Sequence, residues 1–199
     1  MKSSKSRIRP LDKLKTIFIF GLVVLFACNQ DNHTESVLMR YTSKSNGRQK
    51  IYNYRLETIT LNEISTFNYT DIENEINYSL IFDSGKNSIS IIENDIESST
   101  IFLGTKNINI NERDINVKCY LFNNQDILGE RQTIFFNKDY GLIFSDFTSG
   151  SNDYIRTTEK SDDVEKFLEL IKNDTVLMNL DKKFIHQNLP NEIEYKNDK

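Results

Sequence analysis

The sequence lacks most of the residues and motifs on which common enzyme active sites depend. It has no Trp, two Pro, two Cys and two His among 199 residues. His33 lies in a polar segment, and His186 has no Asp, Glu or Cys at metal-ligand spacing. No Ser lies in a G-x-S-x-G or S-x-x-K motif, and there is no Gly-rich phosphate loop. Because hydrolases normally need a nucleophile–base pair or metal ligands, we predict no catalytic residue, no metal site and no cofactor.

Positive charge is also scarce beyond the N-terminal segment. Residues 1–27 hold six of the 25 basic residues and one of the 29 acidic residues, so residues 28–199 carry a net formal charge of −9. A chain this acidic, without a basic stripe, is not expected to bind nucleic acid. It also gains no electrostatic attraction to anionic lipid. Any membrane attachment therefore has to come from another source.

The N-terminal segment has the pattern of a secretory leader. Six basic residues precede or begin an uncharged apolar run at residues 17–27, which ends on the small residue Ala27. As a helix this run would span about 16 Å, roughly half of the ~30 Å hydrocarbon core of a bilayer. A basic region, a short apolar region and a small residue at the cleavage site are typical of signal peptides. We therefore expect residues 1–27 to be removed.

Leu25-Phe26-Ala27-Cys28 resembles the lipobox of bacterial lipoproteins, in which a small residue directly precedes the modified cysteine. The resemblance implies that Cys28 receives a diacylglyceryl group and, after cleavage, an acyl chain on its new amine. Two or more chains hold a protein stably on a membrane. Asn29, in place of the Asp of inner-membrane retention, implies the outer membrane of the cell envelope. A simple secretory leader with a chance cysteine and an uncleaved signal anchor are the alternatives.

The sequence after Cys28 fits one domain with flanking polar segments. We predict a tether at residues 28–36, a single β-rich domain at 37–190 and a polar tail at 191–199. If Cys28 is modified, Cys119 is the one thiol that remains, so no intramolecular disulfide is expected. Cys119 alternates with apolar neighbours on a strand pattern, which predicts a buried and unreactive side chain.

Alternation of apolar and polar residues predicts a meander of short strands. Asn46-Gly47 between two such runs is a strong hairpin signal, because both residues tolerate positive φ. Residues 107–116 are ambiguous and fit either a loop or a weak edge strand. We predict strands at 37–42, 51–61, 64–69, 76–82, 88–92, 96–103, 117–122, 130–136, 142–147 and 154–157.

The periodicity changes after residue 160. Ser161 is a candidate N-cap, and an apolar stripe of Val164, Phe167, Leu168 and Ile171 follows at helical spacing. A second helix is predicted at residues 175–187. The fold class is therefore mainly antiparallel β (α+β): about ten strands in a meander sheet, curled into a half-barrel or a closed barrel, with one or two C-terminal helices.

These features predict a membrane-anchored envelope lipoprotein that is a non-enzymatic binding or structural module. Its expected partners are the membrane, through lipid on Cys28, and either an envelope protein or an apolar ligand. Tyr52, Tyr54 and Phe82 are candidates for an apolar ligand pocket, although core packing also explains aromatic residues at these positions. Two alternatives stay open: a carrier of a lipid or other apolar ligand, and a carboxylate-based hydrolase such as a glycosidase.

The anchor prediction is tested by mass spectrometry of the protein purified from membranes. The expected N-terminus is Cys28 with diacylglyceryl and acyl masses, and residues 1–27 should be absent. The Cys28→Ser variant should accumulate as an uncut or released form, since the acceptor thiol is lost. An intact Met1 or an unmodified Cys28 in the membrane form would contradict the prediction.

Overall fold

The computed structural model describes residues 31–74, 77–123, 131–158 and 161–188. All but the first of these residues belong to one compact unit, Asn32–Lys199. Cys28 and the predicted tail at 191–199 lie outside the described residues. In the described part of the chain, no helix is both long enough and apolar enough to cross a membrane.

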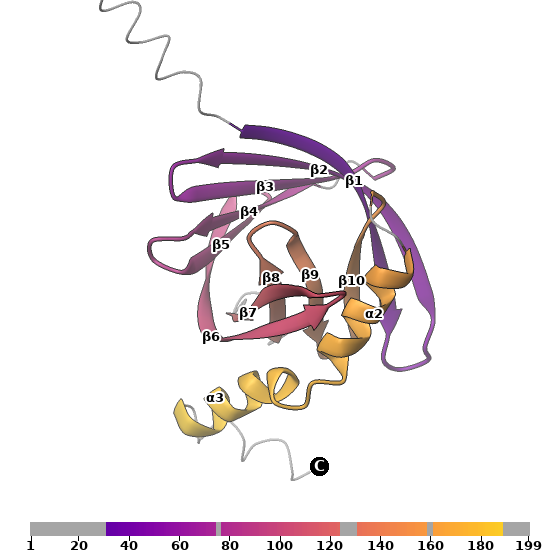
Figure 1. The fold of residues 1–199 in the computed structure, drawn as a ribbon, viewed down its shortest axis with the longest axis vertical. Coiled ribbons are helices and arrows are strands. Elements are labelled where there is room, and N and C mark those ends of the chain that lie inside the picture. The colour runs from indigo at the N-terminus through magenta and orange to yellow at the C-terminus, as the bar shows by residue number, and fades with distance from the viewer. Residues whose placement is uncertain (1–30, 75–76, 124–130, 159–160, 189–199) are drawn as a thin grey trace, which may run out of the picture. The chain divides into compact units, whose positions relative to one another are not determined.

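The described residues form ten antiparallel strands in a closed barrel, which confirms the predicted fold class (Figure 1). The order around the barrel is β1-β10-β9-β8-β7-β6-β5-β4-β3-β2. Apart from the pairing of β1 with β10, neighbours in the barrel are neighbours in sequence, as short turns require. The strands are β1 (Asp31–Ser43), β2 (Gln49–Leu61), β3 (Ile64–Asp71), β4 (Asn77–Asp83), β5 (Ser88–Glu93), β6 (Ile96–Ile110), β7 (Arg113–Asn123), β8 (Arg131–Asn137), β9 (Gly141–Phe147) and β10 (Gly150–Arg156).

Two segments differ from their expected structure. β1 begins at Asp31, six residues before the predicted start, so residues 31–36 of the expected tether lie in a strand of the barrel. Residues 107–116 form neither a loop nor an edge strand, because they are the paired ends of β6 and β7. Asn111 and Glu112 connect these strands with φ values of 47° and 66°, the two positive values of a tight hairpin turn.

The helical part begins where predicted. α2 (Ser161–Lys172) has Asp162 and Asp163 in its first turn, where negative charge complements the helix dipole. The predicted second helix is a short 3-10 turn, η1 (Leu177–Asn179), followed by α3 (Leu180–Asn188). Asp174 accepts hydrogen bonds from the backbone of Val176 and Leu177 and so caps this turn.

The strands bury side chains on both faces and so produce two apolar clusters. On β7, Tyr120 belongs to the cluster inside the barrel, whereas Val117 and Cys119 belong to the cluster between the barrel wall and the helices. The inner cluster contains Val37, Tyr54, Leu56, Phe67, Tyr69, Leu80, Phe82, Ile89, Tyr120, Ile134, Phe136, Leu142 and Tyr154. The outer cluster contains Ile108, Ile110, Val117, Cys119, Phe135, Ile143, Phe144, Val164, Phe167, Leu168, Ile171 and Leu177.

An ion-pair network ties α2 to β1 and β10. Asp153, 2% exposed at its side chain, lies 2.7 Å from both Arg40 Nη2 and Lys172 Nζ. Arg40 also donates to both carboxylate oxygens of Glu165, at 2.7 and 2.9 Å. These bonds to Glu165 raise the pKa of Arg40 and lower that of Glu165. Because Asp153 is buried, removal of either cation would leave an incompletely compensated charge.

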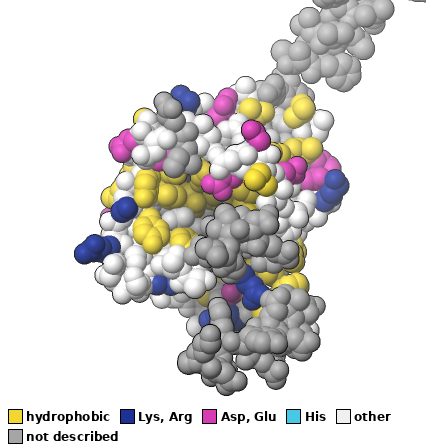
Figure 2. Space-filling model, turned by 180° about the vertical axis from the view of Figure 1, so that it is seen from behind, with side chains coloured by type: hydrophobic (Ala, Val, Ile, Leu, Met, Phe, Trp, Pro, Cys, Tyr) yellow, Lys and Arg dark blue, Asp and Glu magenta, His cyan; other side chains and the backbone are white. Residues whose placement is uncertain are grey.

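Some apolar side chains stay on the surface. On the face seen from behind, hydrophobic side chains gather near the centre, with Asp and Glu side chains around them (Figure 2). Across the described residues, the exposed large apolar side chains are Ile51, Leu61, Ile64, Ile72, Ile96, Ile101, Phe102, Leu170 and Val176.

Truncation of Phe167 tests the packing of α2. Phe167 is 6% exposed and lies in the outer cluster, so Phe167→Ala should lower the free energy of unfolding by about 3–5 kcal/mol. Leu170 lies on the same helix but is 39% exposed, so Leu170→Ala should cost about 1 kcal/mol or less. Urea denaturation followed by circular dichroism measures the free energy of unfolding of both variants. Equal losses of this free energy would refute the observed packing of α2.

Candidate functional site

The wall of the barrel splits between β9 and β10. Residues 144–146 of β9 pair with residues 151–153 of β10, and the pairing ends there. Beyond this point, residues 154–156 stay paired with β1, and Gly141 and Leu142 stay paired with β8. A cavity of about 440 Å³ lies at the split. This volume is within the range of small-molecule sites, roughly 300–1,000 Å³.

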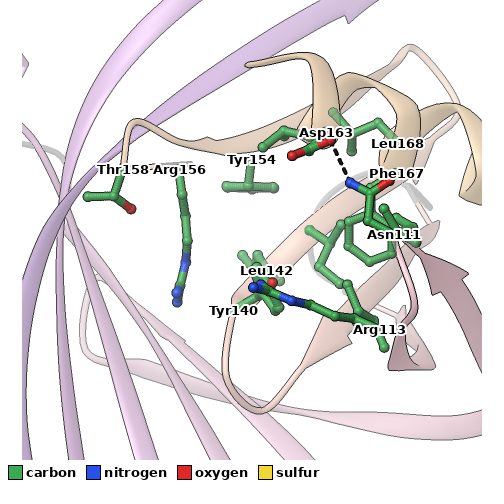
Figure 3. Close-up of a pocket in the computed structure, with 14 residues that line it drawn as sticks. Asn111, Arg113, Tyr140, Leu142, Tyr154, Arg156, Thr158, Asp163, Phe167 and Leu168 are labelled. Atoms are coloured by element: carbon green, nitrogen blue, oxygen red, sulfur yellow. Dashed lines mark hydrogen bonds between the residues drawn. The ribbon is translucent and has the colours of Figure 1, made fainter. Parts of the chain in front are cut away.

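The cavity is lined from the barrel, from two of its turns and from α2 (Figure 3). Tyr154 and Leu142 belong to the inner cluster, whereas Val164, Phe167 and Leu168 belong to the outer one. The site therefore touches both apolar cores. The described residues that line it are Ile110, Asn111, Arg113, Ile115, Tyr140, Leu142, Ile143, Tyr154, Arg156, Thr158, Asp163, Val164, Phe167 and Leu168.

Tyr69 and Gly141 hold the β9 edge of the split. The Leu142 N–H donates a 2.8 Å hydrogen bond to the Tyr69 hydroxyl, which reaches it from β3 across the barrel. A buried N–H without a partner would be costly, so this bond stabilises the edge where β9 has left β10. Gly141 has φ of +71°, and a Cβ there would lie 2.5 Å from the Tyr69 hydroxyl. The site thus requires glycine at this position.

Arg156 bridges the split from the β10 side. Its Nη2 lies 3.0 Å from Glu35 Oε1 and donates to the Asp139 carbonyl oxygen at 2.6 Å. Its guanidinium carbon lies 5.0 Å from the centre of the Tyr140 ring, a cation–π contact. The Arg156 Nε is buried and has no hydrogen-bond partner among the described residues. Arg156 therefore joins the two edges of the split.

The tip of the β6–β7 hairpin supplies the other polar groups. The Asn111 side chain donates to Asp163 Oδ1 at 2.7 Å, which ties the hairpin to the first turn of α2. Arg113 is exposed and lines the cavity, and its guanidinium forms no hydrogen bond or ion pair with any residue in the described ranges. The site can therefore present guanidinium donors beside apolar walls, the combination that orients an amphipathic ligand.

The aromatic residues predicted to form a pocket lie elsewhere. Tyr54 and Phe82 are buried in the inner cluster, Tyr52 packs against it, and none of the three lines the cavity. Lys118 covers Phe82, with its Nζ 4.6 Å from the ring centre. Cys119, expected to be buried and unreactive, is fully buried, and burial raises the pKa of its thiol to about 12.

The inner core also contains a polar cluster. The Tyr78 hydroxyl, Ser145 Oγ and Asn152 Oδ1 are buried without a hydrogen-bond partner among the described residues. Burial raises the pKa of Tyr154, which belongs to the same inner core. Tyr69 stacks on Tyr78 with ring centres 4.8 Å apart. Buried polar atoms of this kind are the usual place for ordered water.

Acidic side chains contribute little to the cavity. Among the described lining residues Asp163 is the one acid, and Asn111 already binds it. In the described part of the chain, no three His, Cys, Asp or Glu side chains gather as a metal site would require. Arg113 and Arg156, the most polar groups of the site, were not predicted from the sequence, because nothing local distinguishes them from other exposed basic residues.

The buried tyrosines and Cys119 predict loss of stability at alkaline pH. Their ordinary pKa values are 10.0 and 9.0, and burial raises the values of Tyr69, Tyr78, Tyr154 and Cys119 in the folded protein. Only the unfolded chain then loses these protons just above pH 9–10, so the free energy of unfolding should fall as pH rises beyond this range. Thermal unfolding at increasing pH measures this loss of stability. A free energy of unfolding that stays constant or rises over this pH range would contradict the prediction.

Comparisons with known proteins give no family. No protein-family model matches the sequence, and no curated protein does. Among solved structures, a DUF1329 family protein from Desulfovibrio piger shares 9% identity over 68% of this chain and 73% of its own, with a TM-score of 0.24. A putative outer membrane lipoprotein-sorting protein domain from Vibrio parahaemolyticus shares 9% identity over 69% and 90%, with a TM-score of 0.23. Such low TM-scores carry no argument about function.

Proposed function

We propose that this protein is a lipid-anchored envelope protein whose barrel is a binding module for a small, largely apolar molecule held at the β9–β10 split. The cavity of about 440 Å³ carries the proposal. It has the size, the apolar walls and the few convergent polar groups that are typical of small-molecule sites.

The anchor part of the proposal rests on the N-terminal sequence. The lipobox-like residues 25–28 supply a cysteine to be lipidated, and the acidic chain that follows has no other evident means of membrane attachment. β1 begins at Asp31, so two residues, Asn29 and Gln30, separate a lipid on Cys28 from the strand. This spacing would keep the barrel close to the membrane, where apolar molecules are concentrated.

The geometry favours binding over hydrolysis at this site. A glycosidase needs two carboxyl groups that face each other across the substrate, at roughly 5–10 Å. Of the described residues one acid, Asp163, lines the cavity, and its Oδ1 accepts a hydrogen bond from Asn111. We therefore assign the cavity to a ligand that is held and not cleaved.

Photocrosslinking tests the site. The full-length protein, held in lipid nanodiscs, is exposed to dodecanol that carries a diazirine, and crosslinked peptides are identified by mass spectrometry. Label should fall on residues 140–143 and 154–168, which contain most of the lining. Thr158→Trp, at an exposed lining residue, should reduce this label because the indole occupies the cavity.

Val176→Trp is the matched control. Val176 is 68% exposed and does not line the cavity, so the same indole there should leave the labelling unchanged. Label spread evenly over the exposed surface, or equal label in the Thr158→Trp variant, would refute the binding site.

A further inference from the structure

We infer that the ligand of this cavity carries an anionic group, a carboxylate at the end of an apolar chain, and that Arg113 and Arg156 bind it. The inference rests on the proposed function, because it names the class of ligand for the same cavity. In Figure 3 the two arginine side chains extend from opposite sides of the cavity, with Tyr140 and Leu142 between them.

Of the two arginines, Arg113 gives the stronger evidence for an anionic ligand. It starts β7, directly after the tight turn at Asn111 and Glu112, and both Asn111 and Arg113 line the cavity. The turn fixes the end of the hairpin, and the hydrogen bond from Asn111 to Asp163 holds it against α2 at 2.7 Å. Among the described residues no carboxylate pairs with Arg113. A guanidinium held at a cavity in this way is suited to a carboxylate, which it binds through two parallel hydrogen bonds.

Arg156 supplies the second guanidinium. Its side chain is 17% exposed, and Glu35, the Asp139 carbonyl and the Tyr140 ring fix its position. Because Arg156 lines the cavity, this fixed guanidinium adds to the positive charge that Arg113 supplies.

The nearby carboxylates do not cancel the preference of the two arginines for an anionic ligand. Glu35 does not line the cavity and lies against Arg156 and, at 3.9 Å, His33. Asp163 lines the cavity, but Asn111 donates to one of its oxygens. A cationic ligand would have to approach Arg113, whose charge is not neutralised by a described residue. The positive charge of Arg113 therefore favours a ligand with a negative charge.

The remaining lining residues indicate that the rest of the ligand is apolar. Leu142 and Tyr154 face the cavity from the barrel core, and Val164, Phe167 and Leu168 face it from α2. Burial of an apolar chain against them is favourable at roughly 25 cal/mol per Å². A single-chain fatty acid combines such a chain with one carboxylate and therefore satisfies both parts of the site.

Competition against the diazirine probe tests this inference on the same full-length protein in nanodiscs. Unlabelled dodecanoate and dodecanol are titrated at neutral pH, and the concentration that halves the cavity label is measured. Arg113→Gln should raise this concentration for dodecanoate by roughly tenfold or more, because a hydrogen bond to a charged group is lost. It should leave the value for dodecanol unchanged. Arg55→Gln, at an exposed residue of β2 that does not line the cavity, is the matched control and should change neither value.

The outcomes separate the two proposals. If dodecanoate and dodecanol respond alike to Arg113→Gln while Thr158→Trp still blocks the probe, the anionic ligand is refuted and the binding site stands. The same conclusion follows if dodecanoate does not compete at all with a probe that labels the cavity. If the probe itself does not label the cavity, the proposed function fails, and the inference fails with it.

Discussion

β9 and β10 share three residue pairs, and the cavity exists because the pairing stops there. If the ladder continued to the ends of both strands, Leu142 and Tyr154 would lie in a closed wall and α2 would cover an unbroken surface. The backbone donors released by the separation need other partners. The Tyr69 hydroxyl, from the opposite side of the barrel, is the hydrogen-bond partner of the Leu142 N–H. A residue of the inner core thus stabilises the separation of β9 from β10.

The helix layer depends on the same region. α2 is attached on one side by the ion pairs of Arg40, Asp153 and Glu165 and on the other by apolar contacts with the outer face of the strands. Asp153 is also the last residue of β10 that pairs with β9. Asp153 therefore takes part both in the attachment of α2 and in the last residue pair before the split, and the lining that α2 contributes is placed by charged contacts as well as by its apolar stripe.

The sequence was sufficient for the type and order of nearly all elements, because period-two alternation and Asn-rich turns are local signals. It was insufficient at residues 107–116, where Asn and Glu occupy positive φ in a turn that composition alone did not identify. The abundance of Asn has a structural use that composition does not reveal. Asn62, Asn87, Asn94 and Asn111 all adopt positive φ at turns, a conformation that Asn tolerates better than most residues.

The site was harder to predict than the fold. Arg113 and Arg156 are far apart in sequence, and only the order of strands around the barrel and the early end of one ladder bring them to one cavity. Alternation indicates which face a side chain occupies, but it does not indicate where two paired strands separate. Tyr54 and Phe82, named from the sequence for an apolar pocket, fill the inner core and do not line this cavity.

The closing pair of the barrel also sets an order for folding. Most strands pair with a sequence neighbour, whereas β1 pairs with β10, and the contact between Arg40 and Asp153 spans 113 residues. Contacts so distant in the chain are slow to form, because the entropy of loop closure opposes them until other structure is present. The hairpins can therefore form early, and closure comes late. Arg156 belongs to β10, so the lining of the cavity is complete only after β10 has joined β1.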